Sequence, residues 1–505
     1  MSSRPFQLFS VALVICGSKF VVAIFDRDGV TVSTDYDMWQ DTAMFARVVL
    51  QITFRLSPVQ LGADPSVQEL EANSTLYDQI RKKSKALHVS LKSIMFPSYR
   101  IHCPRQVRPR PATPFSTTNE VPWVTDQWVT IGPPIWCSLS LCGRATNVWR
   151  VVRMEDGRIP YIDHVCILKN AWRRSDRDSE SAIYQSIKTP PAGVAKFLQG
   201  GDVIAPGSAN VIRVDLLRAP QLSDQPTLIL HRLVLETAGR ALWESNSYLE
   251  IVKGVRAALI GHQDLFNQNI LHRDISPGNI LLSVEPSPIP GEEGFLTDLE
   301  FARISTIITQ DTQESSRRDG TNVHSTHTKW RDAQRGAVMT GTIHFMAIQL
   351  VEAMDNGKAI KHEVHHDVES IIWVLAYAIA RRLINVNSKA EDDEIKNKIS
   401  MFFAAAWGGG SLNAIVTAKQ ALKPLQPPEL ICPLLPSPIL LAFDQLYILM
   451  HQQMIRDAQI RQMKRDKLDP PSLPVQGGPL THKVILGILD ECVENFGSLD
   501  DVGPK

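Results

Sequence analysis

The stretch that most constrains this chain of 505 residues extends from Leu271 to Leu282 and reads LHRDISPGNILL. It places a carboxylate, Asp274, five positions before an amide, Asn279, with the turn-forming pair Pro277 and Gly278 between them. The apolar residues that follow predict a short buried strand. A carboxylate that accepts the proton of an attacking hydroxyl, and an amide oxygen that holds magnesium, are the groups that phosphoryl transfer requires. The stretch therefore predicts a short loop that carries such a site.

The order His272, Arg273, Asp274 and then Asn279 resembles the catalytic loop of protein kinases. The longer string resembles more closely that of the fungal-type protein kinase family. This resemblance implies an α+β, bilobal protein kinase-like fold, with a small β-rich lobe and a larger α-helical lobe, that uses ATP and Mg²⁺. It also implies that Asp274 is the catalytic base and that Asn279 is catalytic and a metal ligand. His272 and Arg273 would support the loop, and Arg273 would pair with a phosphorylated Ser or Thr in 303–338. The alternative is a surface turn between a helix and a strand.

A lysine and a glutamate are predicted to hold the nucleotide phosphates. Lys169 ends the β-run 165–169, and Glu180 begins a helix with apolar Ile183 and Tyr184 three and four positions later. A lysine at this place neutralises the α- and β-phosphates when a carboxylate fixes its side chain. The resemblance implies this pairing of Lys169 with Glu180. The alternative for Lys169 is a solvated charge on an edge strand.

Two further segments are expected to contact the nucleotide. The hairpin around Gly143 can lay backbone amides over phosphates, although the protein-kinase loop has three glycines and this hairpin keeps only one. An ordinary hairpin is the alternative. Glu236 ends the last strand of the small lobe and is placed with the cofactor-binding residues. It leads into 237–240, the expected hinge, whose backbone groups would hold the adenine.

A second metal ligand is predicted at Asp298, which follows an apolar strand where protein kinases carry Asp-Phe-Gly. Hard oxygen ligands of this kind suit magnesium. Here Glu300 replaces the glycine, which removes a flexible point and offers another carboxylate. A cap or turn is the alternative role for Asp298.

The segment 340–349 resembles the end of a protein-kinase activation segment, and its Thr342 is expected to hydrogen-bond near Asp274. Ile348 and Gln349 stand where the usual Pro and Glu occur. Since Gln349 cannot form the buried ion pair of that Glu, the corresponding strut is in doubt. Asp367 opens a helix that is apolar on every side and therefore buried, and it is expected to hold the catalytic-loop backbone. The adjacent His365 and His366 lack further ligands nearby, so no metal is expected there.

Four regions are predicted: an N-terminal α+β extension over 1–100, a linker rich in proline and arginine over 101–135, the small lobe over 136–240 and the large lobe over 241–500. The apolar run 6–16 resembles the core of a signal peptide. We favour a strand, because the same pattern continues after a Gly-Ser turn into a second apolar run, 20–25.

Composition excludes several classes of protein. The 53 basic and 53 acidic residues cancel, so no net charge favours nucleic acid or an anionic membrane. No apolar run reaches the length of a membrane span. The seven cysteines include no Cys-x-x-Cys pair, which indicates a reducing compartment, and we expect an intracellular protein, cytoplasmic or nuclear. The sequence does not indicate an oligomeric state.

Three functions fit these patterns. The first is an ATP-dependent protein kinase that phosphorylates Ser or Thr of a protein substrate. The second is a small-molecule phosphotransferase similar to aminoglycoside and choline kinases, since Ser276 stands where serine/threonine kinases place a substrate-side lysine. The element 341–346, which builds a peptide platform, favours the first. The third is a pseudokinase scaffold, to which the single glycine at 143, Glu300 and Gln349 point.

Overall fold

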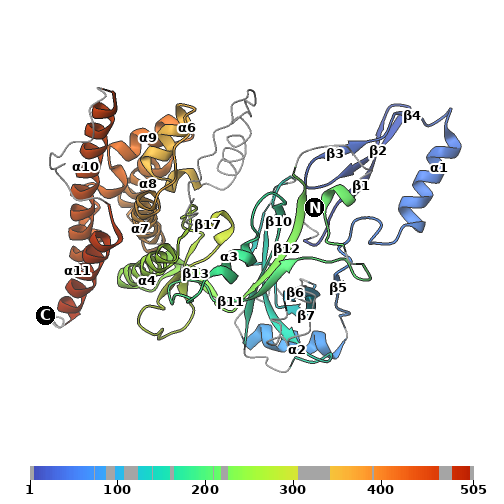
Figure 1. The fold of residues 1–505 in the computed structure, drawn as a ribbon, viewed down its shortest axis with the longest axis horizontal. Helices are drawn as coiled ribbons and strands as arrows, with labels where there is room; N and C mark the ends of the chain where they lie inside the picture. Colours follow the sequence, from blue (N-terminus) through green and yellow to red (C-terminus); the bar gives the residue numbers. More distant parts are fainter. Residues whose placement is uncertain are drawn as a thin grey trace, which may run out of the picture. The chain divides into compact units, whose positions relative to one another are not determined.

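The structure is a computed structural model. It describes residues 5–86 except 73, 97–106, 123–159 except 139 and 141, 164–217 except 209, 226–304, 342–388, 392–465 and 480–500. The fold is mixed α+β, and the chain divides into two compact units. Unit 1 comprises Met1–Ser186 and Lys196–Ala238, and unit 2 comprises Ile187–Ala195 and Gly239–Lys505. Figure 1 labels the elements of both units.

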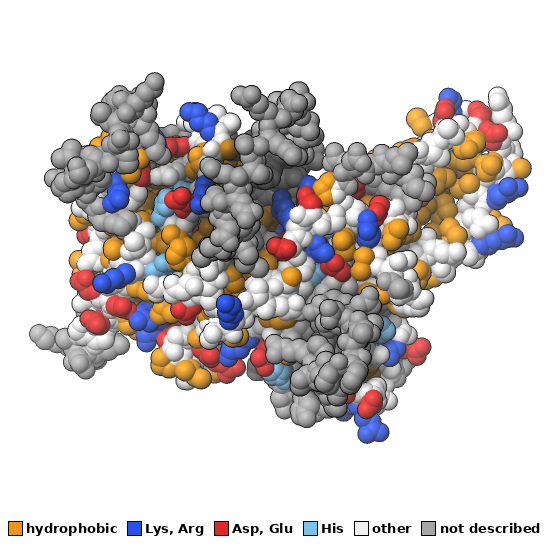
Figure 2. All heavy atoms as spheres, viewed as in Figure 1, with side chains coloured by type: hydrophobic (Ala, Val, Ile, Leu, Met, Phe, Trp, Pro, Cys, Tyr) orange, Lys and Arg blue, Asp and Glu red, His pale blue; other side chains and the backbone are white. Residues whose placement is uncertain are grey.

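Unit 1 begins with a small antiparallel sheet. Its strands are β1 (Ser10–Cys16), β2 (Lys19–Phe25), β3 (Val30–Val32) and β4 (Tyr36–Asp37), all paired through β2. The preference for a strand over a signal-peptide core is thus confirmed for 10–16. The segment that follows forms α1 (Thr42–Leu50) with a π-helical continuation, Gln51–Arg55, and none of its residues is buried. Figure 2 shows hydrophobic side chains gathered on the surface of the N-terminal part of the chain. The exposed side chains there include Trp39 and Phe54.

The second sheet of unit 1 has eight strands among the described residues, in the order β11-β12-β10-β9-β7-β6-β5 with β8 paired to β9. All its named neighbours are antiparallel. Helices α2 (Thr75–Ala86) and α3 (Glu180–Ser186) belong to the same unit. The strands are β5 (Val67–Glu69), β6 (Tyr99–Gln106), β7 (Trp123–Thr130), β8 (Trp136–Cys137), β9 (Asn147–Met154), β10 (Cys166–Arg174), β11 (Phe197–Asp202) and β12 (Leu228–Leu235).

This sheet starts earlier in the chain than we expected. We placed a linker over 101–135 and the start of the small-lobe sheet at 136, whereas β6 and β7 lie within the linker range and β5 precedes it. The reason is alternation along the strands: Ile101, Cys103 and Trp128 are buried in one cluster with Trp149 and Leu168. The Arg-Pro composition near 105–111 concealed that pattern, and 107–122 lie outside the described residues.

A buried arginine ties the N-terminal segment to this sheet. Arg232 of β12 is fully buried and forms an ion pair with Asp64. Its guanidinium also donates to Asn170 Oδ1 (2.7 Å), Ser66 Oγ (2.7 Å) and the carbonyl of His102 (2.8 Å). A buried arginine is stable only when its donors find partners, and most of these come from residues before 103. The segment around Asp64 and Ser66 is therefore part of the same core as β10 and β12.

Unit 2 contains a three-stranded sheet, β13-β15-β16, and the pair β14-β17. Helix α4 packs on β16 at two glycines: a Cβ on Gly294 would lie 2.4 Å from the Gly254 carbonyl oxygen, so Gly294 does not tolerate a larger residue. The strands are β13 (Gly239–Ala241), β14 (Ile270–Leu271), β15 (Ile280–Ser283), β16 (Gly294–Leu296) and β17 (Arg303–Ile304). The helices are α4 (Tyr248–Asn267), α6 (Ile348–Asp355), α7 (Val364–Asn387), α8 (Asp393–Trp407), α9 (Leu412–Gln420), α10 (Ser437–Arg465) and α11 (His482–Asp500).

Several helices lie where the sequence predicted them. Ser247 caps α4 and accepts the amide of Glu250 at 3.1 Å, as the capping pattern indicates. Helix α7 is buried along most of its length. Helices α8 and α9 bury Phe402, Trp407 and Ile415 and are part of the core of unit 2. Within the described ranges no single helix has the length and apolar composition of a membrane span, while α8 and α9, bent by 110°, meet that test only as a pair.

Candidate active site

The predicted phosphate-clamping pair is present in unit 1. Lys169 lies in β10 and Glu180 is the first residue of α3. Lys169 Nζ donates to Glu180 Oε2 at 2.7 Å, and both side chains are buried. The sequence places Lys169 among apolar β10 residues, which removes it from water, so the carboxylate partner is needed to keep its charge.

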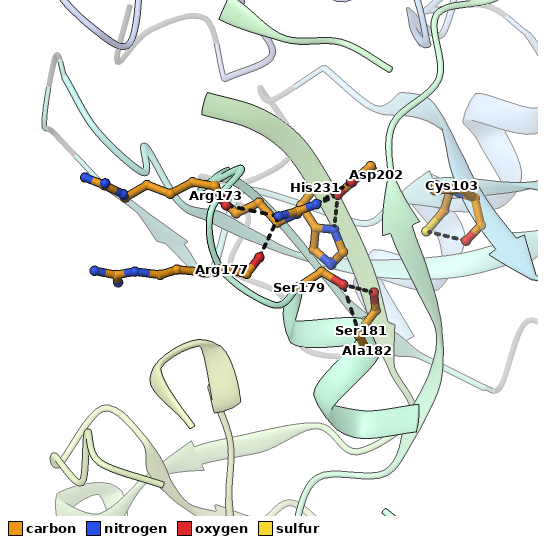
Figure 3. Close-up of polar contacts among 10 residues, drawn as sticks. Cys103, Arg173, Arg177, Ser179, Ser181, Ala182, Asp202 and His231 are labelled. Atoms are coloured by element: carbon orange, nitrogen blue, oxygen red, sulfur yellow. Dashed lines mark hydrogen bonds and ion pairs between the residues drawn. The ribbon is translucent and has the colours of Figure 1, made fainter. Parts of the chain in front are cut away.

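Arg173 fixes the loop that connects β10 to α3 (Figure 3). Its guanidinium binds both carboxylate oxygens of Asp202, at 2.8 and 2.6 Å, and donates to the Arg177 carbonyl at 2.9 Å. His231 Nδ1 lies 2.9 Å from the same carboxylate. Burial alone would raise the pKa of Asp202, but the hydrogen bonds from Arg173 and His231 outweigh it and lower that pKa to about 2. This cluster holds the loop in the position from which Glu180 reaches Lys169.

The hairpin glycine has a different partner from the one expected. Gly143 has φ +84°, a left-handed conformation that suits glycine, and a Cβ there would meet nothing within 4 Å. Its amide, however, donates to the carbonyl of Arg27 at 2.7 Å. In this structure the Gly143 amide therefore donates to the Arg27 carbonyl of the N-terminal segment, the place where we expected a nucleotide phosphate.

Glu236, which we expected to end the last strand before the hinge, directly follows β12 and is exposed. Its backbone amide donates to the Lys196 carbonyl at 2.8 Å, and its carboxylate lies 3.3 Å from His164 Nε2. The chain passes from unit 1 to unit 2 between Ala238 and Gly239, within the segment predicted as the hinge.

The catalytic loop in unit 2 is held by its own polar groups. Asn279 Nδ2 donates to the Asp274 carbonyl at 2.8 Å and lies 3.3 Å from Asp274 Oδ2. His272 is fully buried, donates from Nε2 to the Thr297 carbonyl (3.0 Å) and accepts the Asp274 amide at Nδ1 (3.3 Å). Burial lowers the pKa of His272, which keeps the ring neutral and allows Nδ1 to accept. The predicted supporting role of His272 thus has a geometric basis.

The register of two strands brings Asp298 to the same loop. Ile280 of β15 pairs with Leu296 of β16, and the Thr297 amide donates to the Asn279 carbonyl at 2.9 Å. Asn279 and Asp298 therefore leave the same end of one hairpin. Asp298 and Arg273 have φ values of 64° and 69°, a region that side chains other than glycine seldom adopt. Each costs about 1–3 kcal/mol, and such conformations cluster at functional sites.

Asp367 holds the backbone of this loop, as predicted. It lies in α7, is buried, and accepts the Arg273 amide at Oδ2 (2.9 Å). Two imidazoles also reach it: His262 Nε2 lies 3.0 Å from Oδ2 and His362 Nε2 lies 2.7 Å from Oδ1. Burial alone would raise the pKa of Asp367, but the hydrogen bonds from these histidines hold it well below its usual range.

The end of the segment 340–349 is held by Gln349 itself and by two residues that the sequence did not indicate, Glu369 and Lys419. Gln349 Oε1 accepts from His366 Nε2 at 3.2 Å. Glu369 accepts the Ile348 amide at 2.7 Å, and Lys419 donates to the Met346 carbonyl. Burial raises the pKa of Glu369 and lowers that of Lys419, while the charge of each opposes the effect on the other.

The strut residues come from α7 and α9, and Lys419 lies 5.1 Å from the Trp373 ring centre. The doubt that Gln349 raised is therefore answered by other residues. The side chain of Thr342, and the segment 305–341 that would pair with Arg273, lie outside the described residues.

The donors of the loop suit magnesium. Asn279 uses its amide nitrogen toward Asp274, so its amide oxygen faces the other way, and Asp298 supplies a carboxylate at the same hairpin end. Mg²⁺ is bound in proteins by one or two carboxylates and other oxygens together with substrate phosphates. These two residues would hold the ion.

The predicted residues thus form two groups, each within one unit. Lys169 and Glu180 pair in unit 1, whereas Gly143 and Glu236 contact other protein groups there. In unit 2 the loop gathers five predicted residues, which are His272, Arg273, Asp274, Asn279 and Asp298, above Asp367. Sequence reasoning missed the histidines around Asp367 and the Glu369–Lys419 strut. The sequence drew attention only to the adjacent His365 and His366, where no metal was expected, and not to His262 or His362.

Comparison with known proteins agrees with this geometry. The model of the family described as fungal protein kinase matches residues 1–106 and 120–379. No curated protein matches the chain. The family match includes the N-terminal strands, the Lys169–Glu180 pair and the whole catalytic loop, and it covers most of the chain. The chain belongs to the fungal protein kinase family.

Proposed function

We propose that this chain is an ATP- and magnesium-dependent protein kinase that transfers the γ-phosphate to a Ser or Thr hydroxyl of a protein substrate. The observation that carries the proposal is the arrangement in unit 2: Asn279 is hydrogen-bonded to Asp274 and leaves the same hairpin end as Asp298. A base and two oxygen ligands in this relation suit phosphoryl transfer, and membership in the family makes a kinase activity the expected one.

The residues have distinct roles in this proposal. Asp274 accepts the proton of the substrate hydroxyl. The hydroxyl oxygen forms a bond to the γ-phosphorus of ATP, and the bond between that phosphorus and ADP breaks. Asn279 and Asp298 hold magnesium, which when bound neutralises charge on the phosphate oxygens. Lys169 binds the α- and β-phosphates, and Glu180 holds the lysine side chain in place. Asp367 keeps the loop backbone in its strained form by accepting the Arg273 amide.

The test is magnesium-dependent transfer of ³²P from ATP to a peptide array, with Asp274→Asn as the inactive variant. Asn keeps the size of the side chain but cannot accept the proton, so transfer should fall by at least about a hundredfold. Asp444→Asn, an exposed position on α10, is the matched control and should retain full activity. Equal transfer by wild type and Asp274→Asn would exclude the proposed role of Asp274. Transfer to small hydroxyl compounds but to no peptide would assign the enzyme to the small-molecule class.

One observation favours a second candidate, a pseudokinase scaffold. The Gly143 amide is bonded to Arg27, so the hairpin offers the phosphates fewer donors than a glycine-rich loop does. A scaffold would show nucleotide-dependent thermal stabilisation without turnover. Wild-type protein that binds ATP and magnesium but transfers phosphate no faster than Asp274→Asn would support this candidate over the first.

A further inference from the structure

A chain of buried hydrogen bonds leads from the last helix to the catalytic loop. It starts at His482, the first residue of α11, whose Nε2 lies 2.8 Å from His262 Nδ1. His262 Nε2 then lies 3.0 Å from Asp367 Oδ2, which accepts the Arg273 amide at 2.9 Å. All three side chains of the chain are buried. His482 lies beyond residue 379, where the family match ends.

The direction of each hydrogen bond follows from the carboxylate of Asp367, the last side chain in this series. An ionised carboxylate can only accept, so His262 donates to Asp367 from Nε2. When the His262 ring is neutral, its Nδ1 is an acceptor, and His482 Nε2, 2.8 Å away, is the donor. The carboxylate thus sets the hydrogen on Nε2 of His262, and the hydrogen bond from His482 holds the ring in the orientation that turns Nε2 toward Asp367.

Packing holds His482 where it can do this. Helix α11 buries Ile485, Leu489 and Cys492, and these lie on the same face as His482 at helical spacing. The ring of His482 lies 5.0 Å from the ring of His262. Arg256 of α4, the helix that carries His262, also forms an ion pair with Asp490 of α11.

The Arg273 amide needs a firm acceptor. Arg273 has φ 69°, and a residue with a side chain remains in that region only where its surroundings hold it. Asp367 is that acceptor, and its orientation is set by the Arg273 amide, His262 and His362. If the His262 ring lost its orientation, Asp367 would lose the hydrogen bond from His262 Nε2. Asp367 would then be held less firmly, which would loosen its hold on the Arg273 amide.

We propose that His482 is a positioning residue for the catalytic loop: by donating a hydrogen bond to His262 Nδ1 it holds that ring with Nε2 toward Asp367, which keeps Asp367 oriented to hold the Arg273 amide. The helix beyond the family match thereby acts on the loop that carries Asp274. The consequence for phosphoryl transfer rests on the proposed function, whereas the consequence for the loop backbone does not.

The first measurement is hydrogen exchange of the peptide that contains Arg273, by mass spectrometry on the full chain. His482→Phe keeps an aromatic ring against His262 but removes the donor, and it should raise exchange at Arg273 by at least about tenfold. His482→Gln keeps a donor nitrogen and should stay within about threefold of wild type. His451→Phe, an exposed histidine on α10, is the matched control and should leave exchange unchanged.

The second measurement is steady-state ATP-dependent transfer by the same variants. His482→Phe should lower kcat by about tenfold with little change in KM for ATP, because Lys169 and Glu180 are untouched. His482→Gln should restore most of the loss, which a merely structural role for the ring would not allow. If His482→Phe does not fold, His482→Leu serves as the variant without a donor.

The two readouts separate two kinds of failure. Unchanged hydrogen exchange at Arg273 in His482→Phe overturns the positioning role, whatever the activity. The same holds if His482→Gln raises exchange as much as His482→Phe does. A wild-type protein that transfers no phosphate overturns the proposed function, and the exchange result still decides the role of His482.

Discussion

Lys169 and Glu180 show how a single buried charge depends on its partner. Both side chains are nearly excluded from water and their charged atoms lie 2.7 Å apart. Removing one partner of a buried ion pair is more damaging than replacing both, because it leaves an uncompensated charge in the interior. The pair is therefore sensitive to substitutions that leave the side-chain volume almost unchanged.

We expect Glu180→Gln to lower the free energy of unfolding by about 3 kcal/mol, the lower end of the cost of breaking a buried pair. KM for ATP should rise, because Lys169 is no longer held toward the phosphates. Urea unfolding and ATP titrations check both effects. Glu155→Gln, at a half-exposed pair with Arg153, is the control and should change neither. An unaltered KM for ATP in Glu180→Gln would separate the pair from nucleotide binding.

Two helices share the support of the activation-segment end. Glu369 of α7 accepts the Ile348 amide, and Lys419 of α9 donates to the Met346 carbonyl. Neither bond involves Gln349, the position at which the sequence had indicated a lost strut. The element is therefore stabilised from a different direction, through backbone groups.

A double-mutant cycle tests this element. Lys419→Met leaves Glu369 buried without its counter-charge and should cost about 3–5 kcal/mol. Glu369→Gln with Lys419→Met should cost less than the sum of the single changes, because the charges act on one another. Thermal unfolding of the four proteins gives the coupling. Strict additivity would mean that the two charges stabilise the segment independently.

Unit 1 as a whole includes residues that lie long before the kinase motifs. Because Asp64, Ser66 and the His102 carbonyl are partners of Arg232, removal of residues 1–66 should abolish cooperative folding of β10 and β12. Asp64→Ala alone should cost about 3–5 kcal/mol, and Asp64→Ala with Arg232→Met should recover part of it. Soluble yield and thermal unfolding report the result. A shortened chain with an unchanged unfolding temperature would show that the early segment is dispensable.

The whole molecule should lose stability on mild acidification. Burial lowers the pKa of His366 to about 3 and of His482 to about 4, against 6.5 for an ordinary histidine. Below pH 6.5 these two imidazoles bind protons in the unfolded chain but stay neutral in the folded chain. Their contribution to the free energy of unfolding is therefore complete above pH 6.5 and is lost as pH falls toward 4. Each histidine contributes roughly 1 kcal/mol per pH unit in that window.

Urea unfolding at pH 7.5, 6 and 5 measures this slope. His482→Gln should reduce it, since one of the buried histidines with a lowered pKa is then gone. A free energy of unfolding that stays constant between pH 6.5 and 5 would contradict the buried neutral state of these rings.

Local patterns predicted the local features of this molecule. Four such features depend only on a few neighbouring residues, and the structure contains each of them, although the lengths of the elements differ. They are the Asp274–Asn279 loop, the strand before Lys169, the cap at Ser247 and the buried helix after Asp367. The family prediction is confirmed by the match. The functional roles of the site residues stay predictions.

Contacts between distant segments escaped prediction. His482 meets His262 across 220 positions, and Arg232 meets Asp64 across 168. Each of these residues alone resembles an ordinary polar residue, and nothing in its neighbourhood says what it will contact. The bond between Gly143 and Arg27 escaped for the same reason, and so did the extent of the sheet before residue 136.

The Arg232 cluster also affects how the chain can fold while it is being synthesised. Asp64 is synthesised 168 residues before Arg232, and at about 5–20 residues per second this separation is a wait of roughly ten to thirty seconds. During that interval the early strands are outside the exit tunnel without the residue that completes their core. We therefore expect slower codons before Arg232 to lower the yield of active protein, because the early strands then wait longer for the residue that completes their core.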